Sequence, residues 1–354
     1  MKKFTKILSL ILCLVMALGV LVSCKSNQNG EQNNNAADDK AQALEGDFYD
    51  ENGLYYVALD KNKKTCAGSV GNAKSLKEIV IPETYHGFTV TTIAQAGFAN
   101  CENLESVTIP ATVESIDSLA FQNCEKLAEI KIAENSSLKA IGAQVFENTM
   151  FYNTAANWEN NALYIGNYLI TVKTSVTSCT VKDGTQVIAG YAFYNCASLK
   201  KVELPASLKY IGVLAFNNCE NLTDVCITDL KAWCAMEFAN HMVNPLNGKN
   251  KVLYVNGVKT TELVFTEEIT TINAFAFYGY QKLSKVTFST AIQTIGESAF
   301  KACVLDAEKG KDENGANVIL AYKVLYQGSE TQWKKVSKTG AALPSEGDIY
   351  FAVS

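Results

Sequence analysis

Arginine is missing from this sequence of 354 residues, because all 31 basic residues are lysines. Arginine is the side chain best suited to bidentate contact with phosphate, carboxylate or guanine. The formal net charge is −5, so the chain has no general excess of positive charge that would attract nucleic acid. We therefore expect no nucleic-acid partner.

Histidine is scarce as well, with only His86 and His241 in the chain. A metal site built from three histidines is excluded, and neither histidine lies beside a nucleophile motif such as G-x-S-x-G. The cysteines lack the short C-x₂-C spacing of zinc sites, and no glycine-rich loop of the phosphate-binding type is present. We therefore predict that the protein is not an enzyme, with no catalytic residues, no metal and no cofactor.

The first residues have the layout of a bacterial export signal. Lysines precede an apolar run from Ile7 to Val22, which is shorter than the roughly 20 residues that span a bilayer. The run is followed by Leu-Val-Ser-Cys, which resembles a lipobox with Cys24 as the lipidated residue. We predict a lipoprotein signal peptide over residues 1–23 and membrane attachment through lipid on Cys24. An ordinary signal peptide with a chance cysteine, or an uncleaved anchor, is the alternative.

The next two segments differ sharply in composition. Residues 24–45 are polar, rich in asparagine and free of aromatic side chains, so they cannot bury enough apolar surface to fold. We predict that they form a disordered tether. Residues 46–74 contain strand-like runs separated by turn signals, and we assign them to an N-terminal cap.

Closely similar segments recur along the rest of the chain, such as GFANCENLESVTI from Gly97 and AFYNCASLKKVEL from Ala192. Their phenylalanines recur with a period of 23 residues (121 − 98), in the pairs Phe98 and Phe121, Phe193 and Phe216, and Phe277 and Phe300. Periods in the twenties are typical of solenoids, in which each repeat forms one coil and contacts only its neighbours. The 47 residues from Phe146 to Phe193 (193 − 146) predict a degenerate copy between them.

One full unit runs from Leu199 to Asn221 and illustrates the coil. Val202 and Leu204 alternate with polar residues, as in a half-buried strand, and Pro205 ends that strand. A second apolar step follows at Ile211, which is either a strand or a 3₁₀ turn. Ala-Phe on a short helical or irregular segment and then Asn-Cys complete the unit.

This pattern resembles the bacterial leucine-rich repeats of the Treponema pallidum type, also called BspA-like, over about residues 75–301. The resemblance implies a right-handed leucine-rich-repeat solenoid, mainly β with short helical or irregular turns, and a parallel sheet of stacked coils of ~23 residues. We place the repeats at residues 75–303, with an inserted helix near 228–240. Residues 304–354 are assigned to a C-terminal capping segment, in which Lys323–Val336 is expected to form a closing hairpin.

Of the nine cysteines after Cys24, five occupy one inward-pointing position of the repeat, namely Cys101, Cys124, Cys196, Cys219 and Cys303. Stacked coils would hold neighbouring Cβ atoms about 4.8 Å apart, which is wider than the roughly 3.8 Å of a disulfide. We therefore expect reduced thiols that pack as small apolar side chains. Cys226 and Cys234 could pair only if the chain bends between them.

Strand alternation places the intervening residues of each coil on the outer face of the parallel sheet. The predicted binding face consists of Glu78, Ser106, Thr108, Glu129, Lys131, Lys201, Glu203, Asp224, Lys285 and Thr287. Val80 and Cys226 belong to the same rows. This face is either a recognition surface of mixed charge or simply a solvated surface.

A second group of candidates is aromatic and lies in the irregular stretch between coils. It comprises Tyr152, Trp158, Tyr164 and Tyr168. These rings would either contact a ligand or fill the core of the degenerate coil.

Together these features predict a lipid-anchored protein of the cell surface that binds an extracellular or host macromolecule, a protein or a glycoprotein. The resemblance implies an adhesion-type role without catalysis. The alternatives are a surface lipoprotein or hydrolase that captures glycans or nutrients, and a structural component of the envelope.

Overall fold

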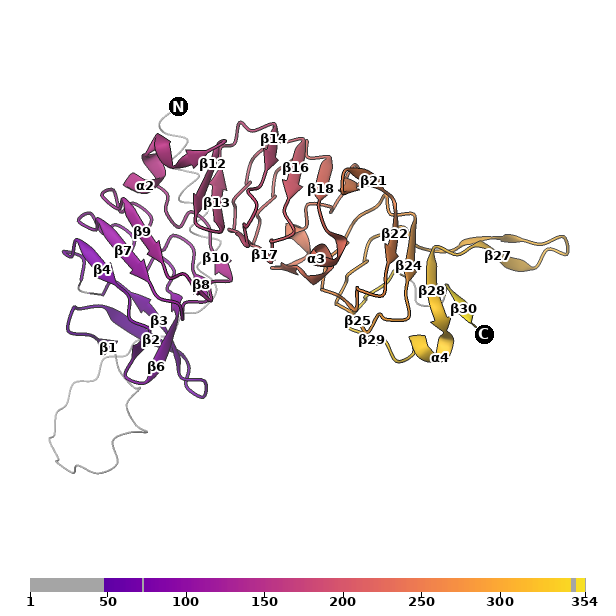
Figure 1. Ribbon diagram of the computed structural model, residues 1–354, viewed down its shortest axis with the longest axis horizontal. Coiled ribbons are helices and arrows are strands. Elements are labelled where there is room, and N and C mark those ends of the chain that lie inside the picture. Colours follow the sequence, from indigo (N-terminus) through magenta and orange to yellow (C-terminus); the bar gives the residue numbers. More distant parts are fainter. Residues whose placement is uncertain (1–47, 72, 345–347, 354) are drawn as a thin grey trace, which may run out of the picture. The chain divides into compact units, whose positions relative to one another are not determined.

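Each repeat folds into a coil with two short strands, and equivalent strands of successive coils pair in parallel (Figure 1). This computed structural model describes residues 48–71, 73–344 and 348–353. The predicted signal peptide, Cys24 and the tether at 24–45 lie outside these residues. The described chain is thus a mainly-β solenoid of stacked coils, which confirms the predicted fold class.

The first strand of each coil carries the alternating apolar residues of the repeat and contributes to one of three parallel ladders. The ladders are β4 (Glu78–Val80), β7 (Ser106–Ile109) and β9 (Glu129–Ile132); β14 (Ser178–Thr180), β16 (Lys201–Leu204), β18 (Asp224–Ile227) and β20 (Val252–Val255); and β22 (Glu262–Phe265), β24 (Lys285–Phe288), β28 (Val324–Ser329) and β30 (Ile349–Val353).

The second apolar step of the coil is a strand, which answers the question that the repeat pattern leaves open. These strands also form three parallel ladders. They are β3 (Thr65–Ser69), β6 (Phe88–Ile93), β8 (Ser115–Ile116) and β10 (Ala140–Ile141); β13 (Tyr168–Val172), β15 (Val187–Ile188), β17 (Tyr210–Ile211) and β19 (Glu237–Phe238); and β23 (Thr271–Ile272), β25 (Thr294–Ile295) and β29 (Ser337–Lys338).

The Ala-Phe segment that follows is a series of tight turns, without a helix, in which two residues have positive φ. In one coil these are Leu214 (φ 52°) and Asn218 (φ 59°). Asparagine tolerates the left-handed region better than other residues with a Cβ, which explains the Asn before four of the five repeat cysteines; Cys303 follows Ala302 (φ 63°). The Asn218 amide also donates to the Asn195 side chain of the preceding coil at 2.8 Å.

The repeat phenylalanines stack within the core of successive coils. Their ring centroids lie 5.1 Å apart for Phe98 and Phe121, 5.5 Å for Phe121 and Phe146, 4.7 Å for Phe193 and Phe216, and 5.2 Å for Phe277 and Phe300. The interplanar angles are all 15° or smaller. The repeat phenylalanines therefore form three runs of stacked rings, which match the three-part division of the ladders.

The N-terminal residues close the first sheet. β1 (Phe48–Tyr49) and β2 (Tyr55–Asp60) pair antiparallel, and β2 pairs antiparallel with β3, which continues in parallel into β6. β5 (Thr84–Tyr85) folds back on β6 through a two-residue turn at His86 and Gly87.

No further copy of the Ala-Phe turn lies between Phe146 and Phe193, contrary to our expectation of a degenerate coil there. The chain forms α2 (Met150–Asn153), the 3₁₀ turn η1 (Ala155–Asn157), β11 (Trp158–Glu159) and β12 (Ala162–Ile165), and then returns through β13. β12 and β13 pair antiparallel, and β13 joins β15 in parallel. We call this segment the first insertion. The coils on its two sides still stack on each other, because the Gly190 amide donates to the Ile141 carbonyl at 2.7 Å.

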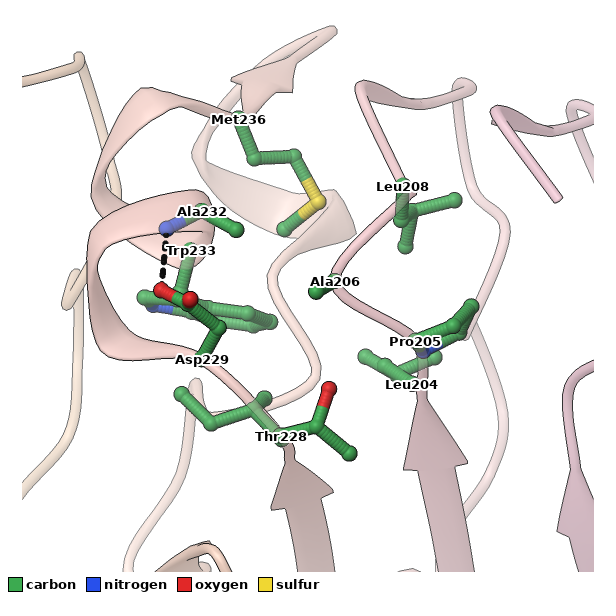
Figure 2. A pocket seen from close by; sticks show the side chains of 10 residues that line it. Leu204, Pro205, Ala206, Leu208, Thr228, Asp229, Ala232, Trp233 and Met236 are labelled. Carbon is green, nitrogen blue, oxygen red and sulfur yellow. Dashed lines mark hydrogen bonds between the residues drawn. The ribbon is translucent and has the colours of Figure 1, made fainter. Parts of the chain in front are cut away.

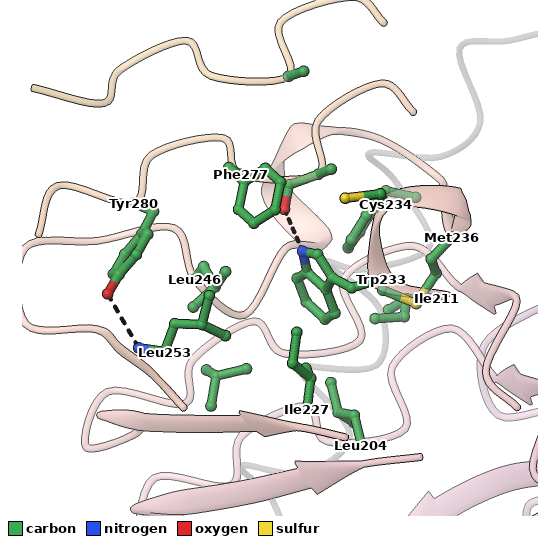
Figure 3. Close-up of a cluster of buried hydrophobic side chains, with 14 of the residues drawn as sticks. Leu204, Ile211, Ile227, Trp233, Cys234, Met236, Leu246, Leu253, Phe277 and Tyr280 are labelled. Carbon is green, nitrogen blue, oxygen red and sulfur yellow. Dashed lines mark hydrogen bonds between the residues drawn. The ribbon is translucent and has the colours of Figure 1, made fainter. Parts of the chain in front are cut away.

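A second insertion separates the last two ladders. α3 (Leu230–Ala235) begins at Asp229, whose carboxylate accepts from the Ala232 amide at 2.8 Å. The buried Trp233 indole donates to the Ala276 carbonyl at 2.8 Å, which joins this helix to the coil of Phe277 (Figure 3). β19, the 3₁₀ turn η2 (His241–Val243) and β21 (Val258–Thr260) complete the insertion, and β21 pairs antiparallel with β20.

The C-terminal segment differs from the closing hairpin that we expected at Lys323–Val336. β28, α4 (Glu330–Trp333) and β29 form a further coil, since β28 pairs in parallel with β24 and β29 with β25. The hairpin lies before this coil, in β26 (Glu308–Lys311) and β27 (Asn317–Ala321). The repeat signal is lost here because α4 is inserted between the two strands, where its Trp333 packs on Phe288 with ring centroids 5.5 Å apart. After β29, Leu343 follows Ala342 where the other coils have phenylalanine, since the Phe300 amide donates to the Ala342 carbonyl as Phe277 does to Ala299.

Candidate binding surface

The outward residues of the long strands form continuous rows because the parallel register is constant. Lys201 lies between Ser178 and Asp224 in adjacent strands. Glu203 lies likewise between Thr180 and Cys226. The neighbouring strands β16 and β18 are seen side by side in Figure 1. We call these outward residues of the long strands the ladder face.

All ten predicted residues of the ladder face lie on this side of their strands, and none of them is buried. Glu78, Glu129 and Lys131 are exposed, and the other seven are half-buried. The structure divides them among the three ladders: five on β4, β7 and β9, three on β16 and β18, and two on β24. The face is therefore a row of separate polar patches rather than one uninterrupted sheet.

Charged side chains on the ladder face pair along single strands. The Lys131 ammonium lies 3.1 Å from the Glu129 carboxylate, and Lys201 lies 2.6 Å from Glu203. The hydrogen bond with Glu203 raises the pKa of Lys201, and the same bond lowers the pKa of Glu203. Both groups of the second pair therefore stay charged at neutral pH, and Glu203 is held further by the Thr180 hydroxyl at 3.2 Å.

The last ladder presents apolar residues beside its polar ones. Val264, Thr287, Leu325 and Tyr350 occupy one row across β22, β24, β28 and β30. Val264 is 55% exposed and Tyr350 is 48% exposed. The surface thus changes from mixed charge to partly apolar between β18 and β30.

Several residues of the ladder face were missed by the sequence prediction. They are Ser178 and Thr180 on β14, Tyr254 on β20, Glu262 and Val264 on β22, Leu325 on β28 and Tyr350 on β30. For β14 and β22, the alternation of polar residues around Cys179 and Leu263 could have indicated these outward positions. No repeat signal marks β20 or β30.

The remaining predicted candidates lie away from this face. Tyr168 is buried, whereas Tyr152, Trp158 and Tyr164 are half-buried. The Trp158 indole donates to the Tyr152 carbonyl at 2.8 Å, and the rings pack edge to face at 5.3 Å. The Tyr164 hydroxyl accepts from the Lys182 amide at 3.2 Å. These rings therefore stabilise the first insertion.

The two histidines are far apart in the fold and play no joint role. His86 is exposed in the turn between β5 and β6. His241 packs against Tyr278 and Phe275, with ring centroids 4.7 Å and 6.1 Å away. Cys226 and Cys234 do not form a disulfide, since the first lies on the ladder face and the second is buried in α3.

A small cavity lies beneath α3, between Leu204, Leu208, Trp233 and Met236 (Figure 2). Its volume is about 10 Å³, room for about one water molecule. This space is a packing gap between the inserted helix and the coil of Pro205. Within the described residues no cluster of three or more His, Cys, Asp or Glu could hold a metal ion. No helix among those residues is both long and apolar enough to span a membrane.

The sequence model of the BspA type leucine rich repeat region matches six copies in this chain, over residues 47–170, 163–256 and 249–309. The chain belongs to this family. The matched repeats contain the three ladders as far as β24, so the ladder face is built largely from family repeats. No curated protein matches the chain.

Solved structures with similar repeats come from several bacteria. The T. pallidum leucine rich repeat protein TpLRR is 20% identical, with 72% of this chain and 88% of that chain covered and a TM-score of 0.30. A leucine rich cell surface protein from Faecalibacterium prausnitzii is 19% identical (85% and 98% covered, TM-score 0.30). The pneumococcal vaccine antigen PcpA is 17% identical (87% and 99%, TM-score 0.32).

Proposed function

We propose that this protein is exported, held on the cell surface by lipid on Cys24, and binds an extracellular or host protein or glycoprotein through the ladder face. The constant register of outward side chains across neighbouring coils carries this proposal. Stacked repeats provide extended surfaces, and leucine-rich repeat proteins generally act by binding other proteins. The role is adhesion-type and does not involve turnover of the partner.

The surface chemistry supports a protein or glycoprotein partner. Paired charges such as Lys201 and Glu203 are fixed in position before a partner arrives, so little side-chain freedom is lost on binding. The exposed Val264 and Tyr350 supply apolar contact area, and tyrosine is enriched at protein interfaces. The surface carries both signs of charge, which favours a specific partner over a general polyanion.

Binding is tested with the purified protein, probed on an array of extracellular-matrix proteins and mucosal glycoproteins. A double variant, Lys201→Glu with Lys285→Glu, reverses two charges on the ladder face. The matched control, Lys209→Glu with Lys301→Glu, reverses two exposed lysines elsewhere. We expect the first variant to lose affinity by about tenfold while the control binds normally. Equal binding by both variants would place recognition outside the ladder face.

The anchor is tested by growing cells with an alkyne fatty acid and isolating the protein. The wild-type protein should carry the label, and the Cys24→Ala protein should not. A Cys24→Ala protein that takes up label would refute the lipid assignment without affecting the binding proposal.

The absence of catalysis is tested on whichever array component binds. Incubation with the protein should leave that component intact in mass spectrometry. Turnover that is abolished by His86→Ala or His241→Ala would favour the hydrolase alternative.

A further inference from the structure

An open cleft of about 490 Å³ lies at the N-terminal end of the solenoid. Residues 49–52, from the end of β1 and the turn after it, form one wall. Residues 80–86, from the end of β4 to the turn after β5, contribute the other. Val80 also belongs to the ladder face and is 69% exposed, so the cleft opens beside the first row of that face. Its volume is that of a small-ligand site.

Aromatic rings line the cleft in fixed positions. The Tyr85 ring stacks on Tyr56 with a centroid distance of 4.3 Å and an interplanar angle of 19°. The Tyr85 hydroxyl donates to the Tyr49 carbonyl at 2.7 Å and so connects the two walls. The His86 ring lies 4.4 Å from Tyr85, and the Tyr49 side chain is 47% exposed.

The charge of the lining has one sign. Asp50 and Glu51 contribute carboxylates, whereas none of the lining residues that the structure describes is a lysine. Asp50 is held rigidly, because it accepts from the amides of Asn52 and Leu54, each at 2.9 Å, and from the Tyr56 hydroxyl at 3.0 Å. Glu51 is exposed at the mouth of the cleft. The negative potential is therefore built into the cap.

We propose that this cleft binds a cationic side chain, a lysine ammonium or an arginine guanidinium, presented by a protein partner. Tyrosine rings attract a cation over their faces, and the carboxylates of Asp50 and Glu51 add a Coulombic attraction. The site would anchor the end of a partner that lies along the ladder face, because Val80 belongs to both. The assignment does not require the ladder face itself to bind.

A cation fits this lining better than a sugar does. A sugar ring needs a flat aromatic face to stack on, and one face of Tyr85 is already covered by Tyr56. The Asp50 carboxylate already accepts three hydrogen bonds, which leaves little capacity for sugar hydroxyls. Its charge nevertheless acts on a cation without a further hydrogen bond.

The full-length protein, labelled with ¹⁵N, is titrated with N-acetyl-lysine methylamide, N-acetyl-arginine methylamide and the neutral isostere N-acetyl-norleucine methylamide. We expect the two cations to shift amide resonances of residues 49–52 and 84–87 with saturation in the millimolar range, whereas norleucine does not. The shifts should weaken with added salt. An oligosaccharide of N-acetylglucosamine is the fourth probe.

Variants separate the two contributions. Glu51→Gln and Tyr49→Leu should each weaken lysine binding by about threefold. Glu125→Gln, at an exposed site elsewhere, should leave binding unchanged. Unshifted core amides in the same spectra verify that each variant is folded.

Three outcomes would overturn the proposal. Equal shifts with norleucine would show a merely apolar groove. Shifts with the oligosaccharide alone would make the cleft a sugar site. No shift with any probe would mean that the cleft binds no free ligand. Each outcome leaves the array test of the ladder face unaffected.

Discussion

The Cys219 thiol donates a hydrogen bond to the backbone carbonyl of Phe193 in the preceding coil, with a sulfur–oxygen distance of 3.0 Å. The same bond joins Cys124 to Phe98 at 3.0 Å, and Cys303 to Phe277 at 3.1 Å. The Phe193 carbonyl accepts from the Cys196 amide at 3.1 Å as well. The repeat cysteine therefore packs as a small apolar side chain and also gives this carbonyl a donor from the next coil. This second role explains the choice of cysteine over alanine or valine at the position.

Replacing this cysteine should destabilise the solenoid. In Cys219→Ala the Phe193 carbonyl loses its thiol donor but keeps the Cys196 amide at 3.1 Å, and a small cavity forms, so we expect a loss of about 1–2 kcal/mol in the free energy of unfolding. Urea denaturation followed by circular dichroism measures the change. Cys226→Ala, on the ladder face, is the matched control and should change stability by less than about 0.5 kcal/mol. Equal losses of stability in both variants would show that the thiol–carbonyl hydrogen bond does not stabilise the solenoid.

The buried thiols should also make stability depend on alkaline pH. Burial raises the pKa of Cys66, Cys179 and Cys219 to about 11, and of Cys196 and Cys303 to about 12, from an ordinary value of 9.0. The unfolded chain releases these protons at lower pH than the folded chain does. Their contribution is therefore fully present below pH 9 and is lost as the pH rises through 11 to 12.

We expect the melting temperature to fall steadily above about pH 9, by an amount that corresponds to a few kcal/mol on summing over the thiols. Differential scanning calorimetry from pH 7 to 11 measures it. The variant Cys196→Ala with Cys219→Ala should show a shallower decline. If the melting temperature of this variant falls with pH as steeply as that of the wild type, other groups, such as lysines, cause the decline.

A glycine follows the second strand of several coils because the neighbouring backbone leaves no room for a side chain. A Cβ at Gly212 would lie 2.4 Å from the Gly190 nitrogen of the preceding coil. Gly212→Ala should therefore force the coils apart and cost about 1–3 kcal/mol. Thermal unfolding measures this cost, with Gly68→Ala as control, since a Cβ there would meet its nearest neighbour at 3.5 Å. A neutral Gly212→Ala would contradict the close approach.

The asparagine that precedes four of the five repeat cysteines should act mainly through its backbone. Asn123 has φ 61°, and its side chain bonds Asn100 at 3.1 Å and Asn148 at 2.8 Å. Asn123→Ala places a Cβ residue without local hydrogen bonds in the left-handed region, so we expect a loss of about 1–2 kcal/mol. Asn123→Gly removes the same side-chain bonds but adopts positive φ freely, and should cost less. Chemical denaturation measures both losses, and equal losses in the two variants would assign the effect to the side-chain bonds instead of the backbone.

The coils around Phe98, Phe193 and Phe277 were predictable because local sequence governs them. A strand of alternating residues, a turn with two left-handed positions and a cysteine facing inward recur at fixed spacing. A single coil cannot bury enough apolar surface to be stable, so the repeated pattern requires stacking. The outward direction of Lys201 and Glu203 follows from the same alternation.

Other features were not predictable, because they depend on contacts between residues far apart in the sequence. The 47-residue spacing from Phe146 to Phe193 suggested a coil, but the segment forms a helix and a hairpin whose last strand replaces a repeat strand. The C-terminal coil escaped notice because α4 interrupts it between the two strands and Leu343 stands in the place of the usual phenylalanine. In both cases any segment that fills the open end of the core suffices, and the repeat pattern is not needed.

By itself, the sequence determined the repeat length, the stacked phenylalanines, the inward thiols and the alternation that produces the ladder face, since period and residue type act within one coil and its neighbour. Only the tertiary structure decided where the ladders are interrupted and how residues 49–52 and 80–86 enclose an acidic, aromatic cleft. Those features arise where antiparallel strands meet the parallel stack, and no local pattern specifies which residues such a meeting brings together.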